Sequence, residues 1–271
     1  MDSHERATLP EPVFTGYRVL VADDNLVNQR LAVRMLENLG CRTEIANNGR
    51  EAVLLHGTRP CDLLFMDCRM PQMDGYQATA HIRAHEPPPR RTPIIALTAS
   101  LAEETRRACA AAGMDDFLPK PIRQAPLKSM LSRWLRPATP PLHEVHESRA
   151  TYGEVDQYTA GSGDELEAVR AVFGSDFNEL AMLYRRDGSQ RIGILMRAAA
   201  AGDNHQLARI AHLLCGSSAS IGAMGLSAMC KQLELCVKSG RDSEALRLLQ
   251  AIEVEYARID ARLQSLTGPA C

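Results

Sequence analysis

The sequence has no excess of charge of either sign and no long hydrophobic run. Its 31 lysine and arginine residues stand against 33 aspartate and glutamate residues, for a formal net charge of −2. This balance gives no general attraction to nucleic acid or to an anionic membrane. The longest uncharged apolar stretches, such as residues 93–102, are shorter than the roughly 18 residues of a spanning helix. We therefore expect protein or small-molecule partners, no nucleic acid and no membrane insertion.

Several further motifs are missing from the sequence. Its eight cysteines form no CxxC pair, and no N-terminal segment resembles a secretory signal peptide. Cysteines in such a chain are typical of reduced thiols, so we expect a cytoplasmic location. The glycine-rich phosphate-binding patterns of P-loop and protein-kinase types are also absent, and we do not expect the chain to bind ATP.

The length of 271 residues is typical of about two domains. In residues 17–136, short apolar runs alternate with amphipathic helical stretches. This alternation predicts an α/β fold, a doubly wound parallel five-stranded sheet with helices on both faces. The predicted strands are Arg18–Ala22, Arg42–Ala46, Asp62–Met66, Pro93–Leu97 and Phe117–Leu118.

The remaining segments differ in character. Residues 1–16 and 137–163 are polar and proline-containing without a period, which predicts a flexible N-terminus and a linker. Residues 164–267 hold helical patterns only, with short glycine breaks that favour antiparallel neighbours in an all-α bundle. The predicted helices are Glu165–Phe173, Phe177–Asp187, Ser189–Ala201, His205–Ile221, Leu226–Val237 and Asp242–Leu266.

Polar residues follow the predicted strands: Asp23 and Asp24, Asp67, Thr98, and Lys120. Because the carboxyl ends of parallel strands meet at one edge of a sheet, these side chains should converge. Three carboxylates repel one another unless a cation joins them, and oxygen ligands suit Mg²⁺. The lysine and the hydroxyl would serve a transferring phosphoryl group, with an aspartate as nucleophile.

The stretches VLVADDN (19–25), FMDCRMPQMDG (65–75), ALTA (96–99) and FLPKP (117–121) resemble the receiver domain of two-component response regulators and hybrid sensor kinases. The resemblance covers residues 17–136 and implies a Mg²⁺ site and a flavodoxin-like fold. The resemblance implies that Asp67 is the phospho-acceptor and that Lys120 pairs with the phosphoryl group. It implies that the metal ligands are Asp23, Asp24, Asp67 and the backbone carbonyl of Arg69. It also implies that Thr98 and Phe117 are switch residues and that the bond between Lys120 and Pro121 is cis.

An aspartate-nucleophile hydrolase would also use aspartate, threonine, lysine and Mg²⁺ on a parallel sheet. Its usual general acid is a second aspartate two residues after the nucleophile, and Arg69 occupies that place here. The sequence therefore disfavours a phosphatase of this class.

In the helix from His205, six residues fall on one side and predict a buried stripe, while His212 points about 140° away, towards solvent. Small residues surround His212, and Gly216 lies on this outer face. Since a helix-interior glycine costs about 1 kcal/mol relative to alanine, clearing space over the imidazole would explain it. An exposed histidine in this setting is a candidate nucleophile. The predicted stripe is Leu207, Ile210, Ala211, Leu214, Ser218 and Ile221.

The stretch IAHLLCGSSASIGA (210–223), followed by Leu226, Cys230 and Leu233-Glu234, resembles the histidine phosphotransfer domain. The resemblance implies a four-helix bundle in residues 164–267 with His212 as the phosphorylated residue. Cys215 stands where the family usually has lysine. We expect transfer to be weakened and hypothesise that Arg209 compensates for the missing charge.

Together these features predict a phosphorelay protein that accepts a phosphoryl group on Asp67 and carries one on His212, to or from another receiver or phosphotransfer protein. The phosphoryl group would come from a sensor histidine kinase, because the Asp-Gly-Gly pattern of a kinase ATP domain is absent. We do not expect such a chain to be a kinase. Magnesium-dependent loss of its own phosphoryl group is compatible with this prediction. The alternative is a receiver switch with a bundle that only docks a kinase. The sequence does not identify the cognate kinase, the downstream regulator, the signal or the oligomeric state. It also does not determine the direction of phosphoryl transfer, whether the relay is intra- or intermolecular, the effect of Cys215, or whether the chain is a hybrid kinase tail.

Overall fold

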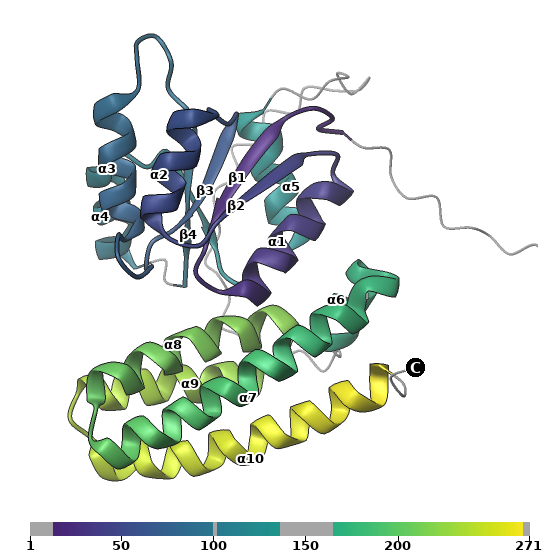
Figure 1. Ribbon diagram of the computed structural model, residues 1–271, viewed down its shortest axis with the longest axis vertical. Coiled ribbons are helices and arrows are strands. Elements are labelled where there is room, and N and C mark those ends of the chain that lie inside the picture. Colours follow the sequence, from purple (N-terminus) through teal and green to yellow (C-terminus); the bar gives the residue numbers. More distant parts are fainter. Residues whose placement is uncertain (1–12, 100–101, 136–164, 268–271) are drawn as a thin grey trace, which may run out of the picture.

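The computed structural model describes residues 13–99, 102–135 and 165–267 (Figure 1). The predicted linker at 137–163 and most of the predicted flexible N-terminus lie outside these residues. Along the described segments, no helix combines the length and the apolar character needed to cross a bilayer.

The α/β part is built on one parallel sheet with the strand order β2-β1-β3-β4-β5. The strands are β1 (Arg18–Ala22), β2 (Arg42–Ala46), β3 (Leu63–Asp67), β4 (Ile94–Thr98) and β5 (Asp116–Pro119). Every residue of the central strands β3 and β4 is buried, as expected for a sheet that helices cover on both faces. The doubly wound α/β prediction is confirmed, and three strands begin one residue away from the predicted start.

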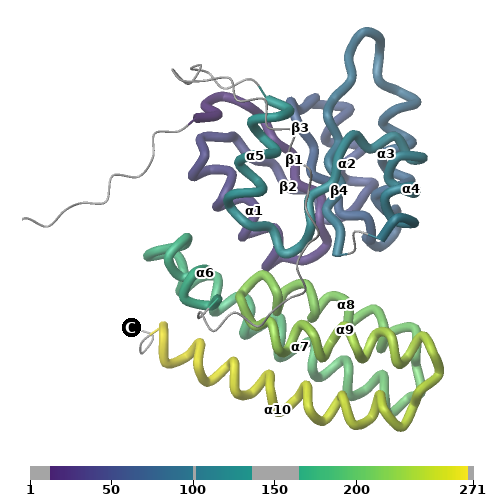
Figure 2. Tube along the Cα trace, turned by 180° about the vertical axis from the view of Figure 1, so that it is seen from behind, coloured from purple at the N-terminus to yellow at the C-terminus, as the bar shows by residue number. Residues whose placement is uncertain are grey.

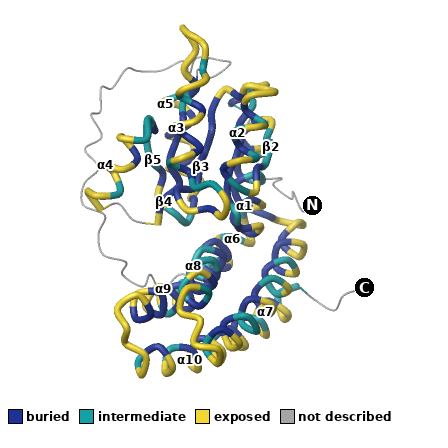
Figure 3. The backbone as a smooth tube through the Cα atoms, turned by 60° about the vertical axis from the view of Figure 1, so that its left-hand side comes forward, coloured by how far each residue is buried: buried dark blue, intermediate teal, exposed yellow. Residues whose placement is uncertain are grey.

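Five helices cover the sheet: α1 (Leu26–Asn38), α2 (Gly49–Thr58), α3 (Gly75–His85), α4 (Glu103–Ala112) and α5 (Gln124–Trp134). Alternate strand residues point to opposite faces, and the core divides accordingly. The cluster beside Val19, Val21 and Phe65 includes residues of α1 and α5, whereas the cluster beside Leu20 and Met66 includes residues of α2, α3 and α4 (Figures 1 and 2). Much of α4 is exposed (Figure 3).

The helical part holds α6 (Glu165–Phe173), a 3₁₀ turn η1 (Gly174–Asp176), α7 (Phe177–Ala201), α8 (Asn204–Ile221), α9 (Met224–Lys238) and α10 (Asp242–Thr267). The four long helices α7 to α10 form the bundle (Figure 2). Gly202 and Gly222 end α7 and α8 in the left-handed conformation, with φ of 66° and 89°, where an L side chain is disfavoured.

The predicted helix break at Gly188 is wrong, because α7 runs through it. Gly188 is buried, and a Cβ atom there would lie 2.4 Å from Cε2 of Tyr256 on α10. The glycine therefore permits close helix packing and does not end the helix. Gly225, also predicted as a break, lies inside α9.

The α/β and helical parts pack on each other through α1, which contacts α7 and α8 (Figure 1). One continuous cluster of buried apolar residues runs from the α1 face of the sheet into the bundle. Figure 3 shows the buried residues concentrated in the sheet and along the inner sides of α7 and α8. This contact places the carboxyl edge of the sheet next to α8.

Candidate functional site

An ammonium group bridges two carboxylates at the carboxyl edge of the sheet. Asp67 ends β3, Asp23 follows β1 and Lys120 follows β5. The Nζ atom of Lys120 lies 2.7 Å from Oδ2 of Asp23 and 2.6 Å from Oδ2 of Asp67. The side chains of both aspartates are less than a tenth exposed. Parallel strands of four or five residues thus bring residues from distant parts of the chain to one point.

Asp24 adds a third carboxylate, and one oxygen from each of Asp23, Asp24 and Asp67 lies within 4.8 Å of the others. Burial, followed by the charges of Asp67 and Asp23, raises the pKa of Asp24 to about 7, against the charge of Lys120. Burial also raises the pKa of Asp23, against the charge of Lys120. One ammonium against three carboxylates leaves negative charge in excess, and this all-oxygen donor set fits a hard divalent cation such as Mg²⁺.

Backbone amides and an asparagine hold the carboxylates in place. The N–H of Arg69 donates to Oδ1 of Asp67 at 3.1 Å, and the N–H of Asn25 donates to Oδ1 of Asp23 at 2.9 Å. The side-chain amide of Asn28 donates to the same Asp23 oxygen at 3.2 Å. Arg69 therefore sits on the loop directly after Asp67, where the resemblance expects its carbonyl near the metal.

The first residue of α3, Gly75, lies close to the backbone of Asp67 at the end of β3, and only a glycine leaves room for this approach. A Cβ atom on Gly75 would lie 2.1 Å from the carbonyl oxygen of Asp67 and 2.9 Å from Cγ of Met66. Real Cβ atoms do not approach so closely. The residue before it, Asp74, forms a capping box with Gln77 that fixes the start of the helix.

Thr98 and Phe117 lie on the neighbouring strands. Thr98 ends β4, is buried, and its carbonyl accepts from the N–H of Lys120 at 2.8 Å. Phe117 on β5 is partly buried, with the guanidinium carbon of Arg106 on α4 4.9 Å from its ring centroid. The bond between Lys120 and Pro121 is cis, as the resemblance implied.

His212 lies on α8, and all six residues of the predicted stripe on this helix are buried. The prediction that the imidazole faces solvent is only half right, because its side chain is 25% exposed. His212 does point away from the bundle core, but the α/β part covers it. A helical periodicity read from the bundle alone cannot show what a distant segment covers.

Glu234 on α9 is the closest acidic partner of the imidazole. Its Oε2 lies 3.1 Å from Nδ1 of His212, and Lys238 one turn later pairs with its other oxygen. Burial would raise the pKa of Glu234, but the hydrogen bonds from His212 and Lys238 and the charge of Arg69 lower it to about 2. An ionised carboxylate can only accept, so this contact requires a hydrogen on Nδ1 and leaves the lone pair on Nε2.

Sequence reasoning did not assign a role to Glu234, although the signal was present. Glu234 is a charged residue beside the apolar positions Cys230, Leu233 and Val237, and it is buried with them. Buried carboxylates are rare unless they are paired. A glutamate on the core side of the helix next to the histidine helix is therefore a candidate partner of that histidine.

Arg69 of the α/β part also reaches His212. Its Nη2 lies 2.9 Å from Nδ1 of His212, and its Nη1 donates to Oε1 of Glu234 at 3.0 Å. A guanidinium can only donate, so its contact requires an unprotonated Nδ1, whereas Glu234 requires the Nδ1–H tautomer. Withdrawal of Arg69 would leave Glu234 as the partner of Nδ1 and favour the tautomer with a nucleophilic Nε2.

The other predicted residues around His212 have different environments. Arg209 is exposed, and among the described residues the arginine that contacts His212 is Arg69. Cys215 lies 3.3 Å from the hydroxyl of Ser227, and burial raises the pKa of its thiol, so it carries no charge at neutral pH. A Cβ atom on Gly216 would lie 3.4 Å from Nδ2 of Asn28, so this glycine faces the α/β part.

Comparison with known families matches one family in the α/β part and another in the helical part. Residues 19–132 match the response regulator receiver domain, and residues 179–264 match the Hpt domain. The chain carries a receiver domain followed by an Hpt domain. The predicted family resemblance is confirmed for both parts, and the sheet and helices described above are their folds.

Two curated relatives are similar to most of this chain. The chain is 34% identical over 255 residues to the sensor histidine kinase GacS of Pseudomonas protegens, which covers 92% of this chain and 27% of GacS. It is 30% identical over 234 residues to the histidine-protein kinase BarA of Shigella flexneri, covering 84% of this chain and 25% of BarA. The chain therefore spans about a quarter of the length of these relatives.

Among solved structures, the chain is similar to the receiver domain of a sensor histidine kinase from Pseudomonas aeruginosa, solved with a magnesium ion in its active site cleft. The identity is 44%, the match covers 44% of this chain and 98% of that chain, and the TM-score is 0.42. A receiver domain together with an Hpt domain, in a chain homologous to part of these histidine kinases, is the architecture of phosphorelay signalling.

Proposed function

We propose that this protein is a phosphorelay intermediate that accepts a phosphoryl group on Asp67 of the receiver domain and carries one on His212 of the Hpt domain. The observation that carries the proposal is the ion pairing of Lys120 with both Asp67 and Asp23, next to the third carboxylate, Asp24, at the carboxyl edge of the sheet. Such a site places a nucleophile, a cation and metal ligands within reach of one phosphoryl group.

In the first step, a carboxylate oxygen of Asp67 attacks the phosphorus of the donor. An oxygen–phosphorus bond forms, and the bond from phosphorus to the donor's leaving atom breaks with its electron pair. Lys120, already within hydrogen-bond distance of Asp67, neutralises charge on the phosphoryl oxygens. The hydroxyl of Thr98, at the end of the neighbouring strand, would donate to another of these oxygens.

Mg²⁺ would be held by Asp23, Asp24, Asp67 and the carbonyl of Arg69, and when bound it supplies positive charge to the carboxylates and the phosphoryl oxygens. The excess negative charge of this edge supports the assignment. The chain's own residues still fix the geometry, since Arg69 and Asn25 hold the two carboxylates through their backbone amides.

In the second step, Nε2 of His212 attacks the phosphorus on Asp67. A nitrogen–phosphorus bond forms while the oxygen–phosphorus bond breaks and returns the Asp67 carboxylate. With Arg69 withdrawn from Nδ1, the hydrogen on Nδ1 stays in place and is shared with Glu234, whose carboxylate lies 3.1 Å away. Glu234 thereby stabilises the positive charge that develops on the ring.

The phosphoryl donor would be a sensor histidine kinase, and the further acceptor another receiver or phosphotransfer protein. Family matches at residues 19–132 and 179–264 fit a protein that does not itself use ATP. Slow loss of the phosphoryl group from Asp67 to water, aided by Mg²⁺, would limit the lifetime of the signal.

The test is a labelling time course with acetyl phosphate and Mg²⁺ on the wild-type chain, Asp67→Asn and His212→Gln. We expect label on Asp67 and then His212 in the wild type, on Asp67 alone in His212→Gln, and none in Asp67→Asn. Label that still reaches Asp67 but never His212 would favour the alternative of a docking-only bundle. A wild-type chain without label on Asp67 would contradict the proposal.

A further inference from the structure

Two cysteine thiols of the receiver domain lie next to each other beside the acidic edge. Cys68 directly follows Asp67 at the end of β3, and Cys109 lies on α4. Their Sγ atoms are 3.9 Å apart, and both residues are buried. The seven cysteines of the described residues are all free thiols. Since Cys68 and Cys109 are 41 positions apart, the packing of α4 on the sheet brings this pair together without a CxxC motif.

Helix α4 can supply the movement that a disulfide bond between these thiols requires. Such a bond is about 2.05 Å long, so the two sulfurs have to approach each other by about 1.9 Å. Cys109 is the one buried residue of α4, and most of this helix is exposed (Figure 3). A helix that is held by so few buried side chains can shift at a low cost in free energy.

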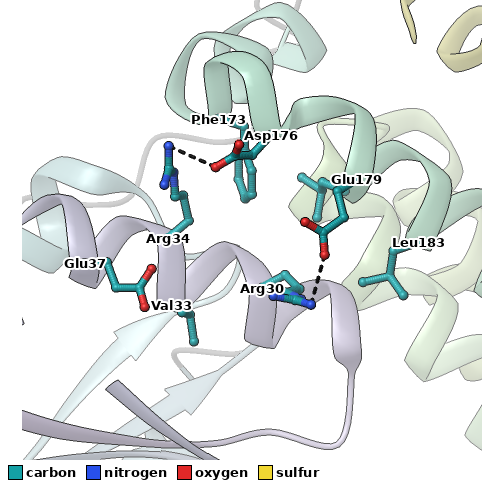
Figure 4. A pocket seen from close by; sticks show the side chains of 9 residues that line it. Arg30, Val33, Arg34, Glu37, Phe173, Asp176, Glu179 and Leu183 are labelled. Atoms are coloured by element: carbon teal, nitrogen blue, oxygen red, sulfur yellow. Dashed lines mark ion pairs between the residues drawn. The ribbon is translucent and has the colours of Figure 1, made fainter. Parts of the chain in front are cut away.

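The Hpt domain packs against a different side of the receiver domain. It contacts α1, where Arg30 pairs with Glu179 at 2.9 Å. One turn later on α1, Arg34 pairs with Asp176 at 3.1 Å, and Figure 4 shows both ion pairs. The apolar cluster that includes α1 lies on one face of the sheet, and the cluster that includes both cysteines lies on the other. An oxidant can therefore reach α4, and α4 can shift, while the two domains stay in contact.

Cys109 is the more acidic thiol of the pair. Its hydrogen bond with Cys68 lowers the pKa of Cys109 to about 7 against the effect of burial, and a hydrogen bond with Tyr76 on α3 acts in the same direction as Cys68. Peroxides react with the thiolate form of a cysteine. Cys109 is therefore the thiol that is oxidised first, and Cys68 lies in contact with it.

We propose that Cys68 and Cys109 form a site that hydrogen peroxide oxidises to a disulfide bond, and that this bond slows the phosphorylation of Asp67. The effect on Asp67 rests on the proposed function, whereas the formation of the disulfide bond does not. The site is a modification site of the receiver domain, and a dithiol reductant returns it to the two free thiols.

The oxidation takes two steps and one molecule of hydrogen peroxide. In the first step, the thiolate of Cys109 attacks one peroxide oxygen. A sulfur–oxygen bond forms, the oxygen–oxygen bond breaks, and hydroxide leaves with the electron pair and takes up the proton that the thiol released. In the second step, Cys68 attacks the sulfur of this sulfenic acid, the sulfur–oxygen bond breaks, and hydroxide leaves with the proton of the Cys68 thiol. The two sulfurs lose two electrons in total, the peroxide gains them, and two molecules of water are formed.

The disulfide bond would act on Asp67 through the backbone of the next residue. Cys68 stands between Asp67 and Arg69, whose backbone N–H donates to Asp67 at 3.1 Å. The carbonyl of Cys68 also accepts from the N–H of Gly75 at the start of α3, at 3.2 Å. A bond that pulls Cys68 towards α4 therefore displaces the acceptor carboxylate, and a misplacement of about 1 Å can slow a reaction about a hundredfold.

The first test detects the disulfide bond. The reduced full-length chain is treated with hydrogen peroxide, its remaining thiols are alkylated, and its peptides are identified by mass spectrometry without reduction. We expect a peptide that links Cys68 to Cys109 in most chains, and the loss of this peptide after treatment with dithiothreitol. Sulfenic or sulfinic acid at Cys109 without the cross-link, or no oxidation of either cysteine, would overturn the inference.

The second test measures the effect on Asp67. Labelling by acetyl phosphate and Mg²⁺ is followed in the reduced chain and in the peroxide-treated chain. We expect oxidation to slow the labelling of Asp67 about tenfold or more, and dithiothreitol to restore the rate. Cys109→Ala, whose labelling in the reduced state also shows that it folds, should be labelled equally fast before and after peroxide. Equal rates for the reduced and the cross-linked wild type, a loss that dithiothreitol does not reverse, or the same loss in Cys109→Ala would overturn the inference.

The matched control is Cys41→Ala, which removes a buried cysteine from the other apolar cluster of the receiver domain. We expect this variant to form the cross-link and to lose labelling as the wild type does. A reduced wild-type chain without label on Asp67 would overturn the proposed function, whereas the cross-linked peptide is detected independently of any label. A labelled chain that forms no cross-link would overturn only the inference.

Discussion

A single buried carboxylate determines how the histidine of the Hpt domain presents its ring. Glu234 has a 9% exposed side chain and binds Nδ1 of His212, Lys238 and Arg69. Hydrogen bonds from His212 and Lys238 lower its pKa to about 2, so that it is ionised at neutral pH. When Arg69 withdraws from Nδ1, this charge favours a hydrogen on Nδ1 and leaves Nε2 as the free nitrogen.

Substitution of this carboxylate tests the assignment. Glu234→Gln should slow transfer to His212 roughly tenfold to a hundredfold, because a hydrogen bond to a charged group contributes about 1.5–3 kcal/mol. Labelling of Asp67 in the same chain should be unaffected. The control is Glu253→Gln at an exposed position of α10. A Glu234→Gln chain that transfers as fast as this control would show that Glu234 does not orient the ring.

A second residue, His56 on α2, makes the receiver domain sensitive to acid. Its side chain is buried between Cys61 and Glu86. Burial lowers the pKa of His56 below its ordinary value of about 6.5 against the charge of Glu86, and the charges of Arg90 and Arg83 lower it further. Below that value the unfolded chain binds a proton that the folded chain does not, so folding stability falls as the pH falls.

We therefore expect the receiver domain's unfolding midpoint to decrease between pH 7.5 and pH 5.5, measured by thermal denaturation of the full chain. His56→Gln should flatten this dependence. His85→Gln, at an exposed position of α3, should retain it. Equal pH dependence in all three chains would exclude His56 as the cause.

At the scale of an element, the start of α3 shows how local chain geometry and the site depend on each other. Gly75 leaves room for the backbone of Asp67 where any side chain would collide with it. The helices α1, α2 and α3 begin after asparagine or aspartate caps, residue types that predict a helix start from sequence. No periodicity of apolar residues in the sequence predicts how closely the start of α3 approaches Asp67.

Gly75→Ala should destabilise the receiver domain by about 2 kcal/mol or more, since an overpacked methyl group must displace backbone. It should also slow the labelling of Asp67. Gly57→Ala in α2 is the matched control, because nothing lies within 4 Å of a Cβ atom there, and it should be neutral or stabilising by up to about 1 kcal/mol. Urea denaturation of both chains measures the difference, and equal stabilities would contradict the packing argument.

Helix ends in the Hpt domain illustrate a limit of element prediction. The glycines that follow α7 and α8 adopt positive φ and were predicted as breaks, whereas Gly188 and Gly225 lie inside helices. A glycine weakens a helix locally, but packing of Gly188 under Tyr256 outweighs that cost. Propensity alone cannot distinguish the two uses.

For the whole molecule, the acidic edge links ligand binding to stability. Three carboxylates with one ammonium repel one another in the folded state, and a cation that binds only the folded chain stabilises it by mass action. Millimolar Mg²⁺ should therefore raise the unfolding midpoint of the receiver domain. Asp24→Asn should weaken this response, while Glu103→Gln at an exposed position of α4 should not. A wild-type chain that does not respond to Mg²⁺ would contradict the metal assignment.

The sequence by itself determined the two folds and most of the candidate site, because those features are local. Strand ends carry Asp23, Asp67 and Lys120, and parallel topology brings strand ends together. Only the tertiary structure decided what surrounds His212. The contact between Arg69 and Glu234 joins residues 165 positions apart, and it depends on how one domain's surface fits the other, which no period or motif within either domain encodes.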